Sequence, residues 1–195
     1  KDRIQEAIEH SKPHARVIVT GCMVQTHRDQ LKAEMPEIDY FLGSGDIEAI
    51  LEAVQATQKG EVISSARSYL EAGEIPRRLS TPPHYAYLKI AEGCRKRCAY
   101  CIIPTIKGPL RSKTEEQILK EFRLLLSQGV KEVILIAQDL GDYAKDRGSK
   151  GSSGLVALLQ ALLQESGNFW IRLLYLYPDE ITPELIEMMK SDSRL

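Results

Sequence analysis

The sequence predicts an α/β protein whose strands run parallel to one another. Strand-like apolar runs alternate with amphipathic helical segments along the chain, which is the pattern of a parallel sheet flanked by helices. The strand-like runs of the second half are almost continuously apolar, as expected where both faces of a sheet are covered. A composition of 43% hydrophobic and 27% charged residues is that of a globular protein and excludes a disordered chain.

Residues 1–60 are predicted to form a small β/α arrangement. A polar helix runs through Ile8, a strand covers 16–20, a second helix continues through Leu31, and a second strand covers 39–42. Two strands are too few to close a stable sheet, so we expect this part to be incomplete at its N-terminus.

A third helix is predicted directly after Asp46, whose carboxylate can cap its first turn. Its apolar side chains recur at helical spacing, so they are expected to form one packed stripe. These side chains are Ile47, Ile50, Leu51 and Val54.

Residues 61–83 contain Gly73, Pro76, Pro82 and Pro83, and their apolar residues recur at no regular spacing. That pattern predicts a linker or an irregular hairpin. We therefore divide the chain into a first part, 1–60, a linker, 61–83, and a second part, 84–195.

The second part repeats a strand followed by a helix three times. A capping box, Thr114-x-x-Gln117, opens the first helix, and Gly129 stands where its C-terminal cap belongs. Successive βα units build either an open doubly wound sheet or part of a barrel. The strands are predicted over 85–91, 133–137 and 170–175, and the helices over 114–128, over 155–163 and from Thr182 onward.

Two finer expectations concern side chains that follow the strands. Tyr175 and Tyr177 are separated by one residue on a predicted strand, so they point the same way. They are expected to fill core space, and lining the cofactor face of a barrel is the alternative. The run Lys145-Asp146-Arg147 is expected to form an exposed loop.

Composition excludes several classes of protein. With 26 basic and 27 acidic residues the net charge is −1, so charge alone indicates no nucleic-acid partner. No apolar run is long enough to span a membrane, and the polar opening lacks the apolar core of a secretory signal. We therefore expect a cytoplasmic protein with no membrane partner. Four cysteines are too few for a disulfide scaffold of this length.

Three of those cysteines, Cys94, Cys98 and Cys101, lie close together directly after a predicted strand. Parallel α/β proteins place their chemistry at this end of the strands. A four-iron cluster normally takes four cysteine ligands, so three would leave one iron open for a substrate. A zinc site with a distant fourth ligand such as His84 is an alternative, and so are thiols that bind no metal.

The cysteine spacing, with the aromatic Tyr100 before the third cysteine, resembles the radical S-adenosylmethionine superfamily. Within it, the segments 87–94, 101–105 and 108–112 look like the methylthiotransferases. Upstream, Val-Thr-Gly-Cys-Met-Val-Gln at 19–25 resembles the last cysteine motif of that family's N-terminal domain.

One branch of the methylthiotransferases is closest. The strand segment 170–178, and Gln138-Asp139 with Tyr143, look like the RimO-type branch, which modifies a ribosomal protein rather than transfer RNA. This resemblance implies a fold for both parts of the chain. Residues 1–60 would be part of a flavodoxin-like N-terminal methylthiotransferase domain, and 84–195 the first half of a radical SAM (βα) partial barrel.

The same resemblance implies cofactors and their ligands. Cys94, Cys98 and Cys101 would hold a 4Fe-4S cluster whose open iron binds S-adenosylmethionine. Tyr100 would pack near the adenine of S-adenosylmethionine, and Gln138 would contact polar groups of that cofactor. Cys22 matches one of three cysteines that bind a second, auxiliary 4Fe-4S cluster, so the complete enzyme would carry two clusters.

The reaction implied is the addition of a methylthio group to the β-carbon of an aspartate in the twelfth protein of the small ribosomal subunit. A sister enzyme that modifies adenosine in transfer RNA is the nearest alternative. A non-enzymatic, zinc-stabilised module that binds the ribosome or RNA is the alternative from a different class.

The segment between Cys94 and Thr114 holds six basic residues and no acidic one. This charge could tune the potential of a cluster, attract an acidic electron donor such as a flavodoxin, or contact ribosomal RNA phosphates. A solvated surface without a partner is the remaining interpretation. The six residues are Arg95, Lys96, Arg97, Lys107, Arg111 and Lys113.

Overall fold

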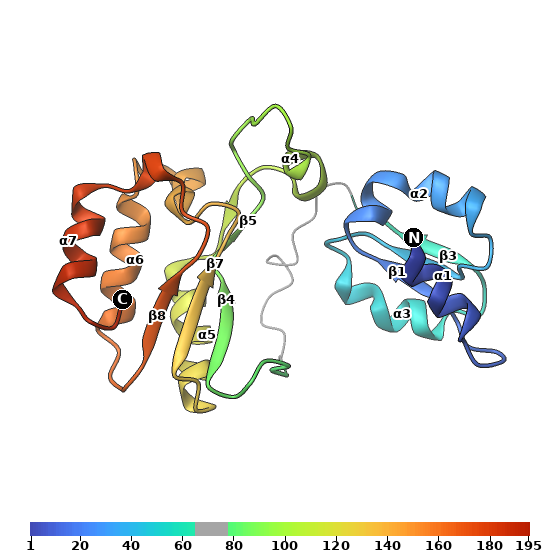
Figure 1. Ribbon diagram of the computed structural model, residues 1–195, viewed down its shortest axis with the longest axis horizontal. Coiled ribbons are helices and arrows are strands. Elements are labelled where there is room, and N and C mark those ends of the chain that lie inside the picture. Colours follow the sequence, from blue (N-terminus) through green and yellow to red (C-terminus); the bar gives the residue numbers. More distant parts are fainter. Residues whose placement is uncertain (65–77) are drawn as a thin grey trace. The chain divides into compact units, whose positions relative to one another are not determined.

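A computed structural model describes residues 1–64 and 78–195 of the chain (Figure 1). Within these ranges the chain forms two compact units. The first unit contains residues 1–64 and 98–108, and the second contains 78–97 and 109–195. Each unit has its own sheet and its own buried core.

The first unit is built on a three-stranded parallel sheet. Its strands, β1 (Ile18–Thr20), β2 (Tyr40–Leu42) and β3 (Gly60–Val62), lie in the order β1-β2-β3. Three helices and one 3₁₀ turn connect or flank the strands. They are α1 (Asp2–Glu9), α2 (Cys22–Glu34), η1 (Ile47–Ala49) and α3 (Ile50–Gln55). The predicted β/α alternation of this part is therefore confirmed, with shorter strands than the sequence suggested.

The predicted role of Asp46 is wrong. Asp46 is buried, but its carboxylate caps no helix. It instead accepts hydrogen bonds from the backbone N–H of Ser64 at 2.9 Å and from the Ser64 hydroxyl at 2.6 Å. The carboxylate is occupied by a residue beyond β3, a tertiary contact that no local pattern encodes.

The apolar stripe predicted after Asp46 does not lie in the core of the first unit. Its four side chains are 38–69% exposed, and Ala53 is the buried residue of α3. The helical spacing correctly predicts a helix here, but the side of the helix that it marks as buried is the exposed one. The exposed residues are Ile47, Ile50, Leu51 and Val54.

The linker predicted over 61–83 begins later than expected, because β3 extends to Val62. Residues 65–77 of that prediction lie outside the described part of the chain.

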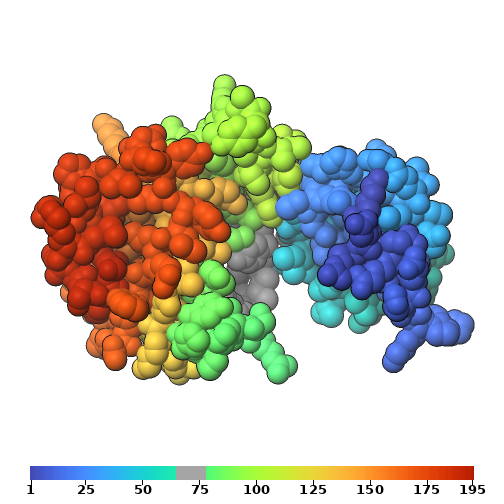
Figure 2. Space-filling view, in the orientation of Figure 1, coloured from blue at the N-terminus to red at the C-terminus, as the bar shows by residue number. Residues whose placement is uncertain are grey.

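The second unit contains the three predicted βα units. Strands β4 (Tyr85–Lys89), β7 (Glu132–Ile136) and β8 (Trp170–Leu173) form a parallel sheet in the order β4-β7-β8. The helices that follow them are α5 (Glu115–Ser127), α6 (Ser153–Leu163) and α7 (Pro183–Ser191). Figure 1 shows α5 behind the sheet. Most of the visible surface of this unit belongs to residues after β7, drawn in orange and red in the space-filling view (Figure 2).

Local signals set the ends of α5. The Thr114 side chain accepts from the Gln117 N–H, and the Gln117 side chain accepts from the Thr114 N–H, so the predicted capping box is present. Gly129 follows the helix with a φ of +87°, in the left-handed region that favours glycine. The core behind the sheet includes Phe122 and Phe169, whose rings meet edge to face with centroids 5.1 Å apart.

Short elements join the main strands to the helices. An antiparallel ribbon pairs β5 (Ala91–Glu92) with β6 (Arg111–Ser112). The remaining elements are α4 (Ile103–Lys107) in the first unit and the 3₁₀ turns η3 (Leu140–Asp142), η4 (Lys145–Arg147) and η5 (Pro178–Glu180) in the second.

Two expectations about side chains near these elements are wrong. The β8 strand ends at Leu173, and Tyr175 takes a positive φ of 64°, so strict alternation does not reach Tyr177. Tyr175 is 67% and Tyr177 38% exposed, and neither fills the core. In the predicted exposed loop, Lys145 turns inward and its side chain is only 8% exposed.

Residues after α7 cover the outer edge of β8. The Ile171 N–H donates to the Arg194 carbonyl at 2.7 Å, and the Trp170 indole N–H donates to the Ser193 carbonyl at 2.9 Å. The Arg194 guanidinium lies over the Phe169 ring, 5.0 Å from its centroid. Among residues 1–64 and 78–195, no helix combines the length and apolar character needed to cross a bilayer.

Candidate metal centre and buried charge cluster

The cysteine loop begins where the β5 strand ends. Gly93 is buried and takes a φ of +76°, which turns the chain out of the strand. Cys94 follows, partly buried and with a free thiol. The backbone N–H of Lys96 donates to Cys94 Sγ at 3.4 Å. A thiolate or a cluster sulfur accepts such a bond, so the backbone here suits a metal-bound cysteine.

The other two cysteines of the loop belong to the first unit. Both are partly buried and outside any disulfide, and the Cys101 N–H donates to the Cys98 carbonyl at 3.0 Å in a tight turn. Tyr100, between them, is 88% exposed. Because Cys94 belongs to the second unit, the convergence of the three sulfurs stays a prediction.

Cys22 is the first residue of α2, and its thiol is exposed. Gly21 precedes it with a φ of +112°, so the turn between β1 and α2 presents the cysteine at the carboxyl end of a parallel strand. The exposed position favours a ligand over the buried core thiol that free cysteines often provide.

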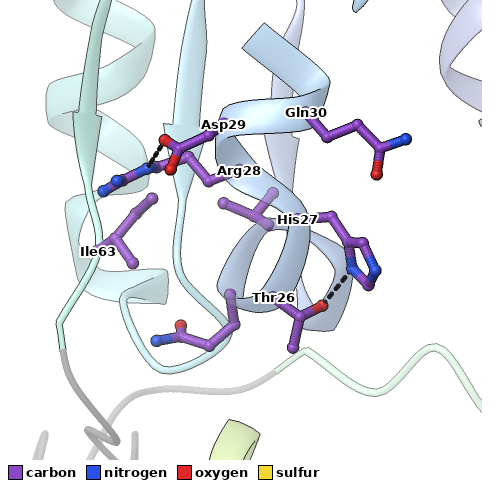
Figure 3. Close-up of a pocket in the computed structure, with 8 residues that line it drawn as sticks. Thr26, His27, Arg28, Asp29, Gln30 and Ile63 are labelled. Carbon is purple, nitrogen blue, oxygen red and sulfur yellow. Dashed lines mark hydrogen bonds and ion pairs between the residues drawn. The ribbon is translucent and has the colours of Figure 1, made fainter. Parts of the chain in front are cut away.

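A pocket of about 420 Å³ lies farther along α2 (Figure 3). His27 interrupts the helical backbone there, and its ring nitrogen Nδ1 lies 2.6 Å from Thr26 Oγ1. Arg28 and Asp29 form an ion pair at the pocket, with Nε and Oδ1 2.9 Å apart. None of the predicted site residues lines this pocket.

Gln138 lies just beyond the carboxyl end of β7. Its side-chain oxygen Oε1 is buried and has no hydrogen-bond partner among residues 1–64 and 78–195. A buried amide oxygen without a donor is costly. Gln138 therefore fits a ligand that brings an N–H or O–H group to this strand end, as the predicted contact with S-adenosylmethionine requires.

Five charged residues of the second unit form a cluster next to Gln138. Asp139, Asp142 and Glu180 each offer one carboxylate oxygen within 4.8 Å of the others. Two ammonium groups, from Lys96 and Lys145, are paired with these oxygens. We call these five residues the buried charge cluster. The two lysines therefore offset most, but not all, of the negative charge of the three carboxylates.

Lys96 connects the cysteine loop to this cluster. Its Nζ lies 2.8 Å from Asp139 Oδ2 and 3.4 Å from Glu180 Oε1, and it stands 4.1 Å from the centroid of the Tyr177 ring. Burial alone would lower the pKa of Lys96, but the hydrogen bond and negative charge of Asp139 outweigh burial. The pKa of Lys96 is therefore raised, and its side chain stays charged.

Lys145 occupies the other side of the cluster. Its Nζ lies 2.9 Å from Asp142 Oδ1 and 2.6 Å from Glu180 Oε1. Burial would lower its pKa, yet the hydrogen bonds to Glu180 and Asp142 raise the pKa above its ordinary value.

Sequence reasoning missed this cluster. The acidic residues could have been suspected, because Asp139 follows an apolar strand and Glu180 lies shortly after the next one. Nothing in the sequence distinguishes Lys96 from the basic residues beside it.

Comparison with protein families matches residues 88–191 to the radical SAM superfamily. The chain belongs to the radical SAM superfamily. Residues 1–43 match a second family, described as uncharacterized protein family UPF0004. The predicted radical SAM partial barrel in an α/β chain is confirmed by this match and by the parallel sheets.

Several curated proteins resemble the whole chain. The relative from Protochlamydia amoebophila is 73% identical over 194 residues, which is 100% of this chain and 41% of that protein. A Chlamydia abortus relative is 60% identical over 100% of this chain and 42% of its own length. One from Desulfitobacterium hafniense is 42% identical over 92% of this chain and 40% of its own length. All three are named ribosomal protein uS12 methylthiotransferase RimO. The chain spans about two fifths of the length of these relatives.

A solved structure also resembles the chain. It is the radical S-adenosylmethionine methyltransferase TsrM from Kitasatospora setae, with cobalamin and a [4Fe-4S] cluster bound. The TM-score is 0.54 at 12% identity, over 95% of this chain and 49% of that chain. At this identity the likeness supports the fold alone.

Proposed function

We propose that this chain is part of a RimO-type radical SAM methylthiotransferase that adds a methylthio group to the β-carbon of an aspartate in the twelfth small-subunit ribosomal protein. The observation that carries the proposal is the similarity, over the whole chain and at up to 73% identity, to proteins named for that activity. We infer a cytoplasmic location, because ribosomes are assembled there.

In this proposal the two parts of the chain belong to different domains. Residues 1–62, which include β3, belong to the N-terminal methylthiotransferase domain, a linker follows β3, and residues 84–195 belong to the radical SAM barrel. The family matches over 1–43 and 88–191 support this division.

The residues proposed to hold the first cluster are Cys94, Cys98 and Cys101. When bound, the 4Fe-4S cluster and S-adenosylmethionine supply the radical chemistry that activates the aspartate carbon. The chain's own residues bind and orient these groups. The Lys96 N–H donates toward the first sulfur, and Gln138 offers its buried amide oxygen to the polar part of S-adenosylmethionine.

Two further residues complete the proposed assignment. Tyr100 is proposed to pack near the adenine, and its high exposure leaves its ring free to stack on a ligand. Cys22 is proposed as one ligand of the auxiliary cluster, and the exposed thiol at the start of α2 supports this role.

Anaerobic reconstitution with iron and sulfide tests the first cluster. The wild-type chain is expected to bind about four iron atoms with the broad charge-transfer absorption of a 4Fe-4S cluster. Cys98→Ala is expected to lose both, and Cys22→Ala, the matched control, is expected to keep them. A colourless wild-type protein that holds zinc tightly would overturn the cluster in favour of the zinc-stabilised module.

The substrate is tested with the enzyme that carries this sequence, incubated with S-adenosylmethionine and a reductant. Mass spectrometry is expected to find a methylthio group on an aspartate of the twelfth ribosomal protein. Methylthiolation of adenosine in transfer RNA, with the ribosomal protein unchanged, would contradict the proposal and favour the sister activity.

We also propose that the exposed side chains of Arg95 and Arg97 dock an acidic electron donor such as a flavodoxin. Both are exposed, whereas Lys96 between them turns inward, so the loop offers two exposed guanidinium groups to a partner. Charge reversal at both positions is expected to slow reduction by flavodoxin more than reduction by dithionite. Equal slowing would remove the docking proposal, and weaker binding to ribosomal RNA instead would point to the RNA contact.

A further inference from the structure

Lys96 is the central residue of the three that separate Cys94 from Cys98. Its backbone and its side chain face different partners. The backbone N–H donates to Cys94 Sγ at 3.4 Å, while the side chain, only 18% exposed, reaches the buried charge cluster. One residue therefore contacts both the first predicted cluster ligand and the core of the unit.

The partners of the Lys96 side chain come from the ends of two different strands. Asp139 follows β7, whereas Tyr177 and Glu180 follow β8. The Asp139 carboxylate is itself fixed, because its Oδ1 accepts the N–H groups of Gly141 at 3.0 Å and Tyr177 at 3.4 Å. The ammonium group thus docks on a rigid acceptor that spans both strand ends.

The other side chains of this part of the loop do not make that connection. Arg95 and Arg97 are exposed, and the hydrogen bond to Cys94 Sγ comes from within the loop. Within residues 94–97, all described, Lys96 provides the ion pairs to the strand ends.

We infer that Lys96 is a positioning residue that fixes the first cluster cysteine on the carboxyl ends of β7 and β8. This inference rests on the proposed function in so far as Cys94 is a cluster ligand. Lys96 sets where the sulfur stands relative to Gln138, and therefore where a cofactor bound at the open iron meets the polar strand ends.

Lys145 provides the matched control. It is buried, pairs with Asp142 and with the same Glu180 oxygen, and comes from η4 rather than from the cysteine loop. If Lys96 only neutralised buried carboxylates, its loss and the loss of Lys145 would have similar effects. If Lys96 positions the loop, only its own loss would release Cys94.

The first experiment uses the metal-free chain and measures hydrogen exchange of the backbone amides of residues 93–97. Lys96→Met is expected to speed their exchange about tenfold, because the loop opens without its anchor, and Lys145→Met is expected to leave it unchanged. Equal acceleration in both variants, or wild-type exchange as fast as in an unstructured peptide, would overturn the inference.

A second variant separates loop position from stability. Lys96→Met leaves Asp139 buried without its partner, which could destabilise the whole unit. Lys96→Met combined with Asp139→Asn removes both charges, so it is expected to regain much of the lost stability while the loop amides still exchange fast. Recovery of slow exchange in the double variant would show that Lys96 acts only through stability.

The reconstituted protein supplies the last readout. With S-adenosylmethionine added, the reduced cluster of Lys96→Met is expected to give an electron paramagnetic resonance spectrum that differs from that of the wild type. Lys96→Arg is expected to restore much of the wild-type spectrum, and Lys145→Met is expected to match it. Identical spectra in all variants would overturn the inference. A wild-type chain that takes up no cluster would refute the proposed function, whereas the exchange comparison on the metal-free chain would still decide the role of Lys96.

Discussion

Asp139 is the residue whose replacement tests the strand-end architecture most directly. Its carboxylate is 2% exposed and joins three segments, since Oδ1 accepts from Gly141 and Tyr177 and Oδ2 pairs with Lys96 at 2.8 Å. Asp139→Ala removes every one of these contacts. Asp139→Asn keeps an oxygen for the two backbone N–H groups and removes only the charge that faces Lys96.

The two substitutions should differ in magnitude. Removing one partner of a buried ion pair costs about 3–5 kcal/mol, and a hydrogen bond to a charged acceptor contributes about 1.5–3 kcal/mol. Lys96 retains Glu180, and the Tyr177 bond is long, so both values fall at the low end. We expect Asp139→Ala to lower the free energy of unfolding by about 4.5 kcal/mol and Asp139→Asn by about 3 kcal/mol.

Denaturant unfolding at pH 7, followed by tryptophan fluorescence, measures both values. The chain has one tryptophan, Trp170, and it lies on β8 in the same unit. Glu187→Gln, which breaks an exposed ion pair with Lys190, is the control and should change stability by less than about 1 kcal/mol. Equal losses for the two Asp139 variants, or losses no larger than the control's, would refute this account of the strand ends.

Three further predictions concern the second unit. Phe122→Ala should cost about 3–5 kcal/mol because it leaves a cavity beside the Phe169 ring; a loss below about 1 kcal/mol in the same unfolding assay would contradict that packing. Thr114→Ala should cost about 1 kcal/mol by removing the capping box of α5, and an unchanged midpoint would show that the cap is not needed. The hydrogen bond from the Arg194 side chain lowers the pKa of Asp192 from 3.8 to about 2. Asp192 therefore stabilises the fold above pH 3.8 and loses this effect as the pH falls towards 2. Asp192→Asn should be destabilising at neutral pH and neutral near pH 2, and a loss independent of pH would disprove the linkage.

Features set by local chemistry could be predicted from the sequence. The ends of α5 follow from Thr114, Gln117 and Gly129, which lie within or next to the helix that they cap. The cysteine spacing could be compared with that of the superfamily, because Cys94, Cys98 and Cys101 lie within eight residues of the chain. The buried leucines of α6 recur at helical spacing, so one helical period places them on one face; they are Leu155, Leu158, Leu159 and Leu162.

Features that depend on distant residues could not be predicted. Lys96 meets Asp139 and Glu180 only after the strands have assembled. In the sequence it is one of three consecutive basic residues, with Arg95 and Arg97 on either side. The predicted cap at Asp46 failed similarly, because the carboxylate binds Ser64 rather than its own helix.

The prediction that Tyr175 faces the core failed for a different reason. Alternation along a strand assumes extended backbone, but the chain leaves β8 at Leu173 and Tyr175 takes a positive φ. Its carbonyl accepts the Leu140 N–H at 2.9 Å, which joins the turns after β7 and β8. A side chain of this size in that backbone region is uncommon, and the sequence carries no sign of it.

The Ser193–Arg194 contact with β8 has a practical consequence for handling the protein. A strand at the edge of a sheet can pair with the same strand of another molecule and seed aggregation. The Arg194 carbonyl accepts the N–H of Ile171 on β8, and the charged Arg194 side chain lies beside that edge. Without the Ser193–Arg194 segment against it this edge would be open, and the protein should then form insoluble assemblies during expression.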